Sequence, residues 1–312
     1  MSDTCNSDRV PWDIVVCPAC RSDLQTADKT VTCPQCGTVH PVPSAGPADL
    51  RLQSEKTVVV QHRLGRSLFD AHPQPDFSPI SVNPNATPVL ADSDLPIHLT
   101  KEQASYLPPA AHPGALCLDL GCGNGEYRAP VEKLGYRWVG VDYGDPDAPV
   151  HADAHALPFP DNTFDTVISL AVLEHVQYPH VVLREAWRVL KPGGRMVASV
   201  AYLVPFHGAS FFNMTHYGAF SAFHDAGFEV LRVAPEKVYL GIRALSFAGL
   251  FQGASRWLCY AAVAPLIVAH RLWWRFRRRS APAQYSIEQM YLLTSGAFTI
   301  VANRPRDTEG HD

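Results

Sequence analysis

Short apolar runs separated by polar or glycine-rich stretches recur between residues 115 and 202. Such runs, bounded by turn residues and too short for a helix, indicate buried strands. One longer stretch, residues 179–190, has apolar residues at helical spacing and predicts a helix that directs Trp187 into the core. The predicted strands of this region are residues 116–120, 136–142, 162–170 and 195–201.

The pattern continues in the C-terminal third, where residues 219–226 predict a helix that ends at Gly227. Residues 228–233 predict a further strand, and the last strand is expected to run from residue 290 to residue 302. Segment 240–283 lies between these strands as an insertion. It combines apolar stretches and tryptophans with a basic cluster, whose members are Arg275, Arg277, Arg278 and Arg279.

The apolar part of this insertion is too short to cross a membrane. A spanning helix needs about 20 apolar residues, whereas Arg256 and Arg271 bracket a shorter run that contains Pro265. Two interpretations stay open. In one, the segment is a helical hairpin lying in a membrane interface, with its arginines on anionic headgroups. In the other, it caps the domain or a second subunit and walls an apolar acceptor pocket.

Composition and charge narrow the classes of protein. A chain of 312 residues suffices for one large or two modest domains, and its apolar content of 46% allows a sizeable core. The formal net charge of -4 gives no overall attraction to nucleic acid. Residues 1–10 are polar and show no signal peptide. We therefore expect a cytoplasmic location, with a peripheral position at the inner membrane face as the alternative.

Four of the eight cysteines form two Cys-x-x-Cys pairs near the N-terminus. Thiolates on two tight turns suit tetrahedral Zn²⁺ at a closed structural site, and a reducing compartment disfavours disulfides. Because the surrounding segment has little core, metal binding would supply much of its folding free energy. Free or redox-active thiol pairs are the alternative. The predicted zinc ligands are Cys17, Cys20, Cys33 and Cys36, with His40 expected at the surface.

Residues 57–113 carry only weak patterns, and prolines recur with Asn, Ser and Asp between residues 73 and 96. This composition favours turns and extended chain, as a flexible linker or as a lid over the acceptor pocket. Thr100 and Gln103 have capping-box spacing and predict a short helix. The expected division is therefore a module at 1–55, a connector at 56–112 and a larger domain at 113–304.

The predicted strand at 116–120 runs directly into glycines spaced two apart. Glycines tolerate the backbone conformations of a tight turn and let a ligand lie against bare backbone at the carboxyl end of the strand. Such a turn alone is a weak signal. About twenty residues further on, the second predicted strand ends at Asp142, where a carboxylate is placed to accept both hydroxyls of a ribose.

The glycine turn and Asp142 belong to a longer series of motifs, which are Asp119-Leu-Gly-Cys-Gly-Asn-Gly125, Asp142, Asp153-Ala154, Leu157-Pro-Phe, Phe164-Asp-Thr-Val, Leu173-Glu-His and Leu190-Lys-Pro-Gly-Gly. This series resembles the class I S-adenosylmethionine-dependent methyltransferases that act on small molecules. The resemblance covers about residues 112–202 and implies an α/β fold, a Rossmann-like seven-stranded class I methyltransferase sheet whose last strand is antiparallel. Residues 10–52 resemble the zinc ribbon of the methyltransferase-activator type.

This resemblance implies how S-adenosylmethionine would be held. Asp119 would face its amino-acid end, Asp142 its ribose, and Asp153 with Ala154 its adenine edge, whereas Asp165 and Cys122 would be structural. A general base, where one is used, would be His207, His216 or His175, because an imidazole suits proton removal from an alcohol or amine. Transfer by alignment alone is the alternative. The implied cofactor-binding residues are Asp119, Gly121, Gly123, Asp142, Asp153, Ala154 and Leu170.

The predicted function is methyl transfer from S-adenosylmethionine to an O, N or C atom of a small-molecule, lipid-like or glycan-like acceptor. Methylation of rRNA or tRNA is the second hypothesis, since zinc-bearing modules precede methyltransferase domains there as well. A non-enzymatic cofactor-binding scaffold is the third, and the intact Asp119, Gly121, Gly123 and Asp142 argue against it. The sequence indicates neither the identity of the acceptor nor the oligomeric state.

Overall fold

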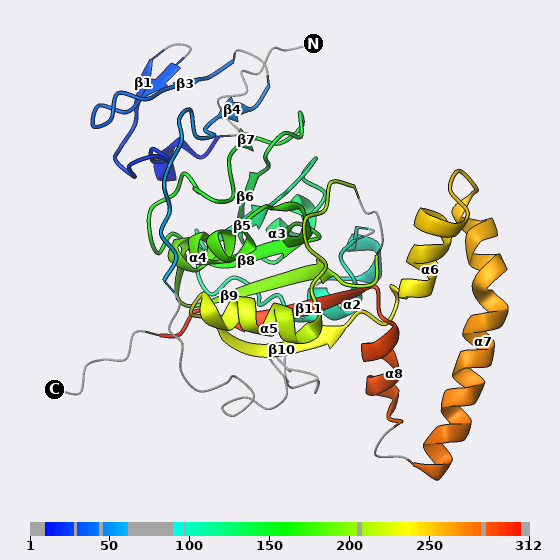
Figure 1. Ribbon diagram of the computed structural model, residues 1–312. Coiled ribbons are helices and arrows are strands. Elements are labelled where there is room, and N and C mark those ends of the chain that lie inside the picture. The colour runs from blue at the N-terminus through cyan, green and yellow to red at the C-terminus, as the bar shows by residue number, and fades with distance from the viewer. Residues whose placement is uncertain are drawn as a thin grey trace.

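A central sheet with helices on both faces makes up the body of the protein, and a small β module and a helical arm project from it (Figure 1). The structure is a computed structural model, and it describes residues 10–27, 30–43, 46–61, 90–96, 98–204, 208–281 and 285–306.

The central sheet has six strands in the order β10-β11-β9-β8-β5-β6. Strands β5, β6, β8 and β9 are parallel, and β11 is antiparallel to both of its neighbours. The predicted Rossmann-like α/β fold is thus confirmed, including the antiparallel last strand, although within the described residues the sheet has six strands rather than the expected seven. The strands are β5 (Leu116–Leu120), β6 (Arg137–Val141), β8 (Phe164–Leu170), β9 (Leu190–Ala201), β10 (Glu229–Pro235) and β11 (Ala297–Asn303).

Beyond β6, the sheet continues only as the two-residue strand β7 (Val150–His151). It is attached to the end of β6 through a parallel bridge between Asp142 and His151. On its other side, β7 pairs in parallel with β4 (Ala48–Asp49) of the N-terminal module. The edge of the large sheet is therefore continued by backbone from a segment about a hundred residues earlier in the chain.

Alternate side chains of the central strands fill two cores. On one face, helices α4 (Pro179–Val189) and α5 (His216–Asp225) cover a core that includes Met196 and Ala198 of β9. On the other face, α2 (Lys101–Ser105) and α3 (Arg128–Lys133) cover Val197, as expected from the two-residue period of a strand. The predicted core residue Trp187 packs at the rim of the first core and donates its indole N–H to the Gly227 carbonyl at 3.1 Å.

The N-terminal module is a three-stranded antiparallel sheet of β1 (Gln25–Ala27), β2 (Thr30–Thr32) and β3 (Val39–Pro41). The prediction that His40 lies at the surface is wrong, because its side chain is fully buried. His40 is the central residue of β3, whose two neighbours face outward, so the alternation of a strand turns it into the interior of the module.

Side-chain caps begin one helix that the sequence predicted and one that it did not. The predicted capping box forms: Thr100 Oγ1 accepts from the Gln103 N–H at 3.1 Å, and Gln103 Oε1 accepts from the Thr100 N–H at 2.7 Å. Residues 290–294, predicted as strand, belong instead to helix α8 (Ile287–Thr294). Ser286 caps this helix by accepting from the Gln289 N–H at 3.1 Å, and Met290 is its buried residue.

The insertion folds as a helical arm. Helix α6 (Gly241–Leu245) continues into a short π-helix, η5 (Ser246–Leu250), and then α7 (Arg256–Ser280) runs back alongside them. Helix α7 is the element furthest from the sheet, and α8 returns the chain to β11 (Figure 1). None of the helices in the described part of the chain combines the length and apolar character that a bilayer-crossing segment needs.

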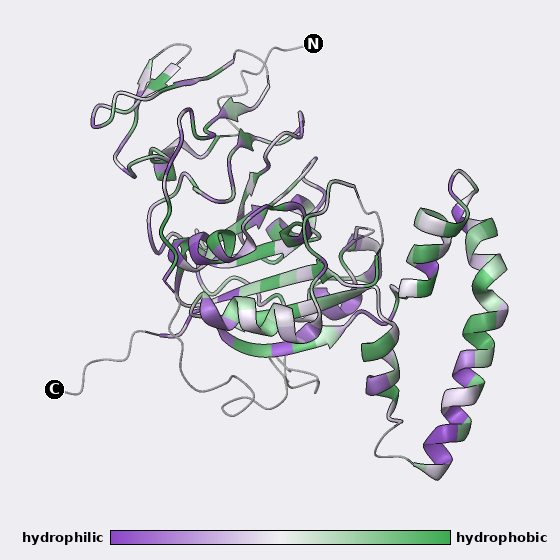
Figure 2. Ribbon diagram, viewed as in Figure 1, coloured by the Kyte–Doolittle hydropathy of each residue, from purple (hydrophilic) through white to green (hydrophobic). Residues whose placement is uncertain are grey.

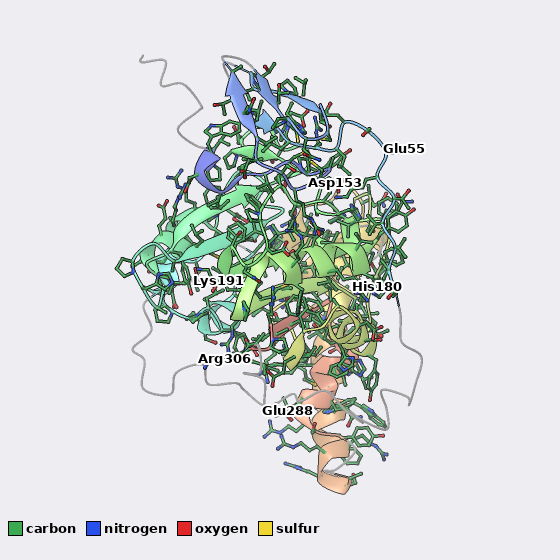
Figure 3. All side chains as sticks on the ribbon, turned by 90° about the vertical axis from the view of Figure 1, so that its left-hand side faces the viewer. Glu55, Asp153, His180, Lys191, Glu288 and Arg306 are labelled. Atoms are coloured by element: carbon green, nitrogen blue, oxygen red, sulfur yellow. The ribbon has the colours of Figure 1, made fainter. Side chains whose placement is uncertain are left out.

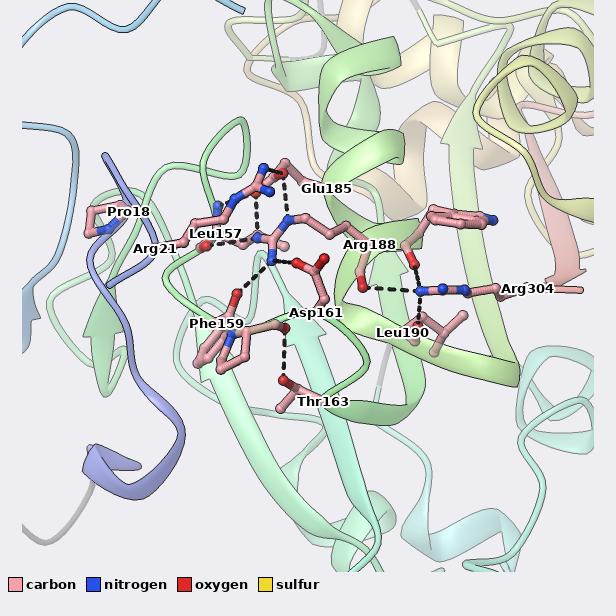
Figure 4. A network of polar contacts seen from close by, with 12 residues as sticks. Pro18, Arg21, Leu157, Phe159, Asp161, Thr163, Glu185, Arg188, Leu190 and Arg304 are labelled. Carbon is pink, nitrogen blue, oxygen red and sulfur yellow. Dashed lines mark hydrogen bonds and ion pairs between the residues drawn. The ribbon is translucent and has the colours of Figure 1, made fainter. Parts of the chain in front are cut away.

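A buried ion-pair network joins α4 to the loop before β8 (Figure 4). The Arg188 guanidinium donates to Glu185 at 2.7 and 2.8 Å, to Asp161 at 2.9 Å, and to two backbone carbonyls of residues 157 and 159. Glu185 also accepts from the Leu157 N–H at 2.9 Å and from Arg21 of the N-terminal module at 3.2 Å. The network thus fixes the loop, the helix and the module to one another.

Replacing Arg188 by methionine should strongly destabilise the protein. The change leaves the buried Glu185 carboxylate and two carbonyls without their donor, and breaking a buried pair in this way costs about 3–5 kcal/mol. Urea unfolding measures the effect. Arg128→Met is the matched control, since Arg128 pairs with Glu132 at the surface and should lose less than about 1 kcal/mol. Equal losses in the two variants would contradict this account of the network.

Candidate cofactor site

The turn after β5 presents bare backbone. Gly121 has φ +79°, and a Cβ added there would lie 2.4 Å from Val172 Cγ2. Both the left-handed conformation and the lack of space therefore require glycine at this position. Gly123 also has a positive φ, +49°, whereas Gly125 lies against the Trp138 ring. Cys122 is buried beneath the turn, as the structural interpretation of its thiol requires.

Asp142 ties this turn to the end of β6. Its Oδ2 accepts from the Gly123 N–H at 3.1 Å, and its Oδ1 accepts from the N–H groups of Gly144 at 2.9 Å and Asp145 at 3.0 Å. A carboxylate offers about four acceptor positions, so these backbone donors leave capacity for a ligand hydroxyl. The side chain predicted to bind ribose thus also orders the backbone on both sides of the site.

Asp119 is buried below the glycine turn, with 1% of its surface exposed. Its Oδ2 accepts from the Trp138 indole N–H at 2.9 Å. Burial raises the pKa of Asp119 to about 7, against the opposing effect of this hydrogen bond. The side chain does not line the cavity described next, so within the described residues its contacts are those of a support for the turn.

A cavity of about 950 Å³ opens at the carboxyl ends of β5 and β6. This volume is in the range of small-molecule and cofactor sites. The predicted binding residue Leu170 is buried outside the lining, and the following Ala171 and Val172 line the cavity instead. Among the sequence-predicted site residues, those in the lining are Gly121, Asp142, Asp153, Ala154 and His175.

Asp153 lies between the β module and the sheet, and the segment that carries Glu55 descends beside it (Figure 3). Its Oδ1 accepts from the His155 N–H at 2.9 Å and contacts His155 Nδ1 at 2.7 Å. Burial acts to raise the pKa of Asp153, but the hydrogen bonds from His155 prevail and lower it. The carboxylate that lines the cavity is therefore held ionised.

The connector forms part of the cavity wall. The sequence patterns had left open whether this segment is a flexible linker or a lid. Lys56, Val58 and Val60 line the cavity, and Lys56 Nζ donates to the Pro18 carbonyl of the first cysteine turn at 2.8 Å. The Val16 N–H of the same turn donates to the Pro158 carbonyl at 2.9 Å. The only sequence signal for this wall was the short apolar run at residues 58–60 in an otherwise polar segment.

The three histidines considered as bases lie in different places. His175 lines the cavity, and its Nδ1 is 3.3 Å from the Ala209 carbonyl oxygen. His216 begins α5, where its ring contacts Tyr217 and Phe298, and burial lowers its pKa. It lines neither of the two cavities described here. His207 lies outside the described residues.

Two acids near this region, the buried Glu174 and the partly buried Glu236, were not singled out from the sequence. Glu174 is 2% exposed, and its Oε2 has no hydrogen-bond partner among the described residues. Burial raises the pKa of Glu174, and it raises that of Glu236 to about 7. Glu236 accepts from Gln103 Nε2 at 3.0 Å. The Leu-Glu-His motif drew attention to its histidine, although the glutamate is the more buried residue.

A second cavity of about 630 Å³ lies between the end of β9 and the helical arm. Tyr202 and Leu203 follow β9 directly, Leu266 and Ile267 come from α7, and Met290 comes from α8. The walls are mostly apolar, so this groove suits an uncharged chain or ring. Such a groove is what the cap interpretation of the insertion expected.

The four cysteines of the N-terminal module meet at one point. Their Sγ atoms all lie within 4.8 Å of one another, with Cys17 and Cys36 at 3.6 Å and Cys20 and Cys33 at 3.4 Å. Tetrahedral Zn²⁺ with Zn–S bonds of about 2.3 Å places its sulfurs about 3.8 Å apart. The donor set therefore fits this ion, and within the described residues His40 is not part of it.

Comparisons with known proteins match the part of the chain that contains the glycine turn. Residues 118–198 match the family model described as a methyltransferase domain. The chain is 37% identical over 125 residues to the 27-O-demethylrifamycin SV methyltransferase of Amycolatopsis mediterranei, which is 34% of this chain and 45% of the relative. It is 35% identical over 102 residues to the ubiquinone biosynthesis O-methyltransferase of Maricaulis maris, 28% of this chain and 40% of the relative.

Among solved structures, the chain is similar to a complex between the Haloferax volcanii Trm112 methyltransferase activator and the putative methyltransferase. The TM-score is 0.42 at 21% identity, over 68% of this chain and 92% of that one. The chain spans less than half the length of the curated relatives named above. On the evidence of the family match and the Rossmann-like sheet, residues 118–198 carry a methyltransferase domain.

Proposed function

We propose that the protein is an S-adenosylmethionine-dependent methyltransferase acting on a small-molecule, lipid-like or glycan-like acceptor. The observation that carries this proposal is the cavity at the ends of β5 and β6, where a glycine turn fastened by Asp142 faces Asp153. Ligands bind at this end of the strands in open α/β sheets. The methyltransferase-domain match over residues 118–198 supports the same assignment.

The proposed roles follow from the contacts. Bound S-adenosylmethionine supplies an electrophilic methyl group on its sulfonium. Gly121 gives the close approach of backbone, Asp142 accepts from a ribose hydroxyl, and Asp153 with Ala154 faces the adenine. Asp119 and Leu170 act from beneath the site rather than in its wall. Of the two candidate histidines in the described part of the chain, His175 lines the cavity and His216 does not, so His175 is the proposed base where the acceptor needs to lose a proton.

The acceptor class is inferred from the groove and from the relatives. The two named relatives are methyltransferases of a rifamycin and of ubiquinone biosynthesis, and the 630 Å³ groove beside β9 is largely apolar. Both favour a small or lipid-like acceptor over RNA, as does the net charge of -4. The helical arm is the proposed site of peripheral membrane contact.

Asp142→Ala should weaken binding of S-adenosylhomocysteine by about tenfold to a hundredfold, the loss expected for hydrogen bonds to a charged group. Calorimetry on the full chain measures it. Asp142→Asn keeps one carbonyl acceptor and should lose less. Asp147→Ala is the matched control, since it removes the same charge from an exposed position outside the cavity. Wild-type protein that takes up neither this product nor S-adenosylmethionine would refute the proposed function.

We further propose that the four cysteines bind Zn²⁺ and that this ion stabilises the cavity wall. Lys56, which lines the cavity, donates to the first cysteine turn. Removal of the metal should therefore loosen both this turn and the wall segment that contains Lys56. The double change Cys17→Ser/Cys33→Ser should abolish stoichiometric zinc uptake, measured by atomic absorption. It should also speed hydrogen exchange over residues 46–61 and weaken S-adenosylhomocysteine binding. Cys259→Ser, in the arm, is the control. Unchanged metal content in the double variant would disprove the site.

A further inference from the structure

Helix α7 has two faces, and only one of them is used by the fold. Cys259, Val263 and Ile267 recur every four residues and are buried against the rest of the arm. The opposite face is uncovered, although much of it is apolar. Its large exposed side chains are Trp257 at 73%, Leu258 at 53%, Val268 at 56%, Leu272 at 61%, Trp273 at 59% and Phe276 at 62%. Large exposed apolar side chains gathered on one helix in this way indicate an interaction surface.

Charge is distributed unevenly along the same helix. The first part of α7 is apolar and its C-terminal part is strongly hydrophilic (Figure 2). Residues 256–280 contain no acidic residue. Arg275, Arg278 and Arg279 are exposed and make no ion pair with the described residues, whereas Arg277 is engaged with Tyr285. The partner of this face must therefore accept both apolar side chains and several positive charges.

A bilayer surface with anionic lipids has these two properties together. Tryptophan and phenylalanine side chains enter the boundary between headgroups and acyl chains, while arginines remain with the phosphates. The uncharged run from Trp257 to His270 is too short to span, but a helix lying in the plane of the interface needs no such length. RNA phosphates would satisfy the arginines but leave Leu258, Val268 and Leu272 exposed to water.

We propose that the outer face of α7 docks the protein on an anionic lipid bilayer, with Trp257, Leu272, Trp273 and Phe276 inserted and Arg275, Arg278 and Arg279 on lipid phosphates. Helix α7 then lies parallel to the membrane, between the bilayer and the apolar groove to which its Leu266 and Ile267 contribute. The inference names the partner of the proposed membrane contact. Docking itself requires neither cofactor nor acceptor.

Vesicle flotation of the full chain tests the proposal. The protein should float with vesicles of equal parts phosphatidylcholine and phosphatidylglycerol, and weakly with phosphatidylcholine alone, and high salt should reduce binding. Changing Arg275, Arg278 and Arg279 to Ala should lower the partition coefficient by roughly a hundredfold, from the contribution of each arginine near an anionic surface. The control changes Lys101, Arg128 and Lys237 to Ala, the same loss of charge at exposed positions, and should float as the wild type does.

A second variant separates insertion from simple adsorption. Leu272→Gln/Trp273→Gln/Phe276→Gln keeps every arginine and should still lose most binding, and brominated lipid should quench the tryptophan fluorescence of the wild type. S-adenosylhomocysteine affinity, measured on each variant, reports an intact domain and keeps this test distinct from that of the proposed function. The proposal would be overturned if the wild-type protein did not float with the vesicles, or if the Lys101/Arg128/Lys237 control lost as much binding as the arginine variant. It would also be overturned if sedimentation showed a dimer that the apolar variant dissociates, while no variant binds vesicles.

Discussion

The contacts of Asp142 are the constraint on which the candidate site depends. Its carboxylate accepts from the backbone of the glycine turn and from the turn after β6, and its own backbone N–H and carbonyl pair with residues 150 and 152. One residue therefore fixes the ends of β5, β6 and β7. Because a cofactor site made of bare backbone has few side chains to hold its shape, this anchoring sets the geometry of the cavity wall.

The N-terminal module is joined to the same point through β7. Strand β4 pairs with β7 in parallel, and Arg51, two residues after β4, binds Asp49 at 2.7 Å and the Tyr143 carbonyl at 3.1 Å. Tyr143 in turn lines the cavity. The module is thus attached by backbone pairing, by the Arg21–Glu185 pair and by Lys56. Through these bonds the module and the cavity wall are held in one arrangement.

The helical arm has an inner and an outer apolar surface. Its inner residues wall the apolar groove at the end of β9, and its outer face carries unburied tryptophan, leucine and phenylalanine side chains. An amphipathic arm that leaves both an apolar groove and an apolar outer face accessible is costly in water. An apolar phase in contact with the outer face would remove this free-energy cost of exposing apolar surface to water. The groove and the exposed outer face therefore belong to the same helical arm.

Local chemistry in the sequence determined the strands β5, β6, β8 and β9, the capping box at Thr100, the four cysteines and the glycine turn, because each depends on neighbours close along the chain. Long-range packing decided the rest. His40 is buried by the pleat of a three-stranded sheet, residues 290–294 belong to a helix that Ser286 caps, and residues 56–60 wall a cavity whose strand-end lining comes from residues 120–121 and 141–142. No periodicity encodes such contacts, since they exist only once the chain has folded.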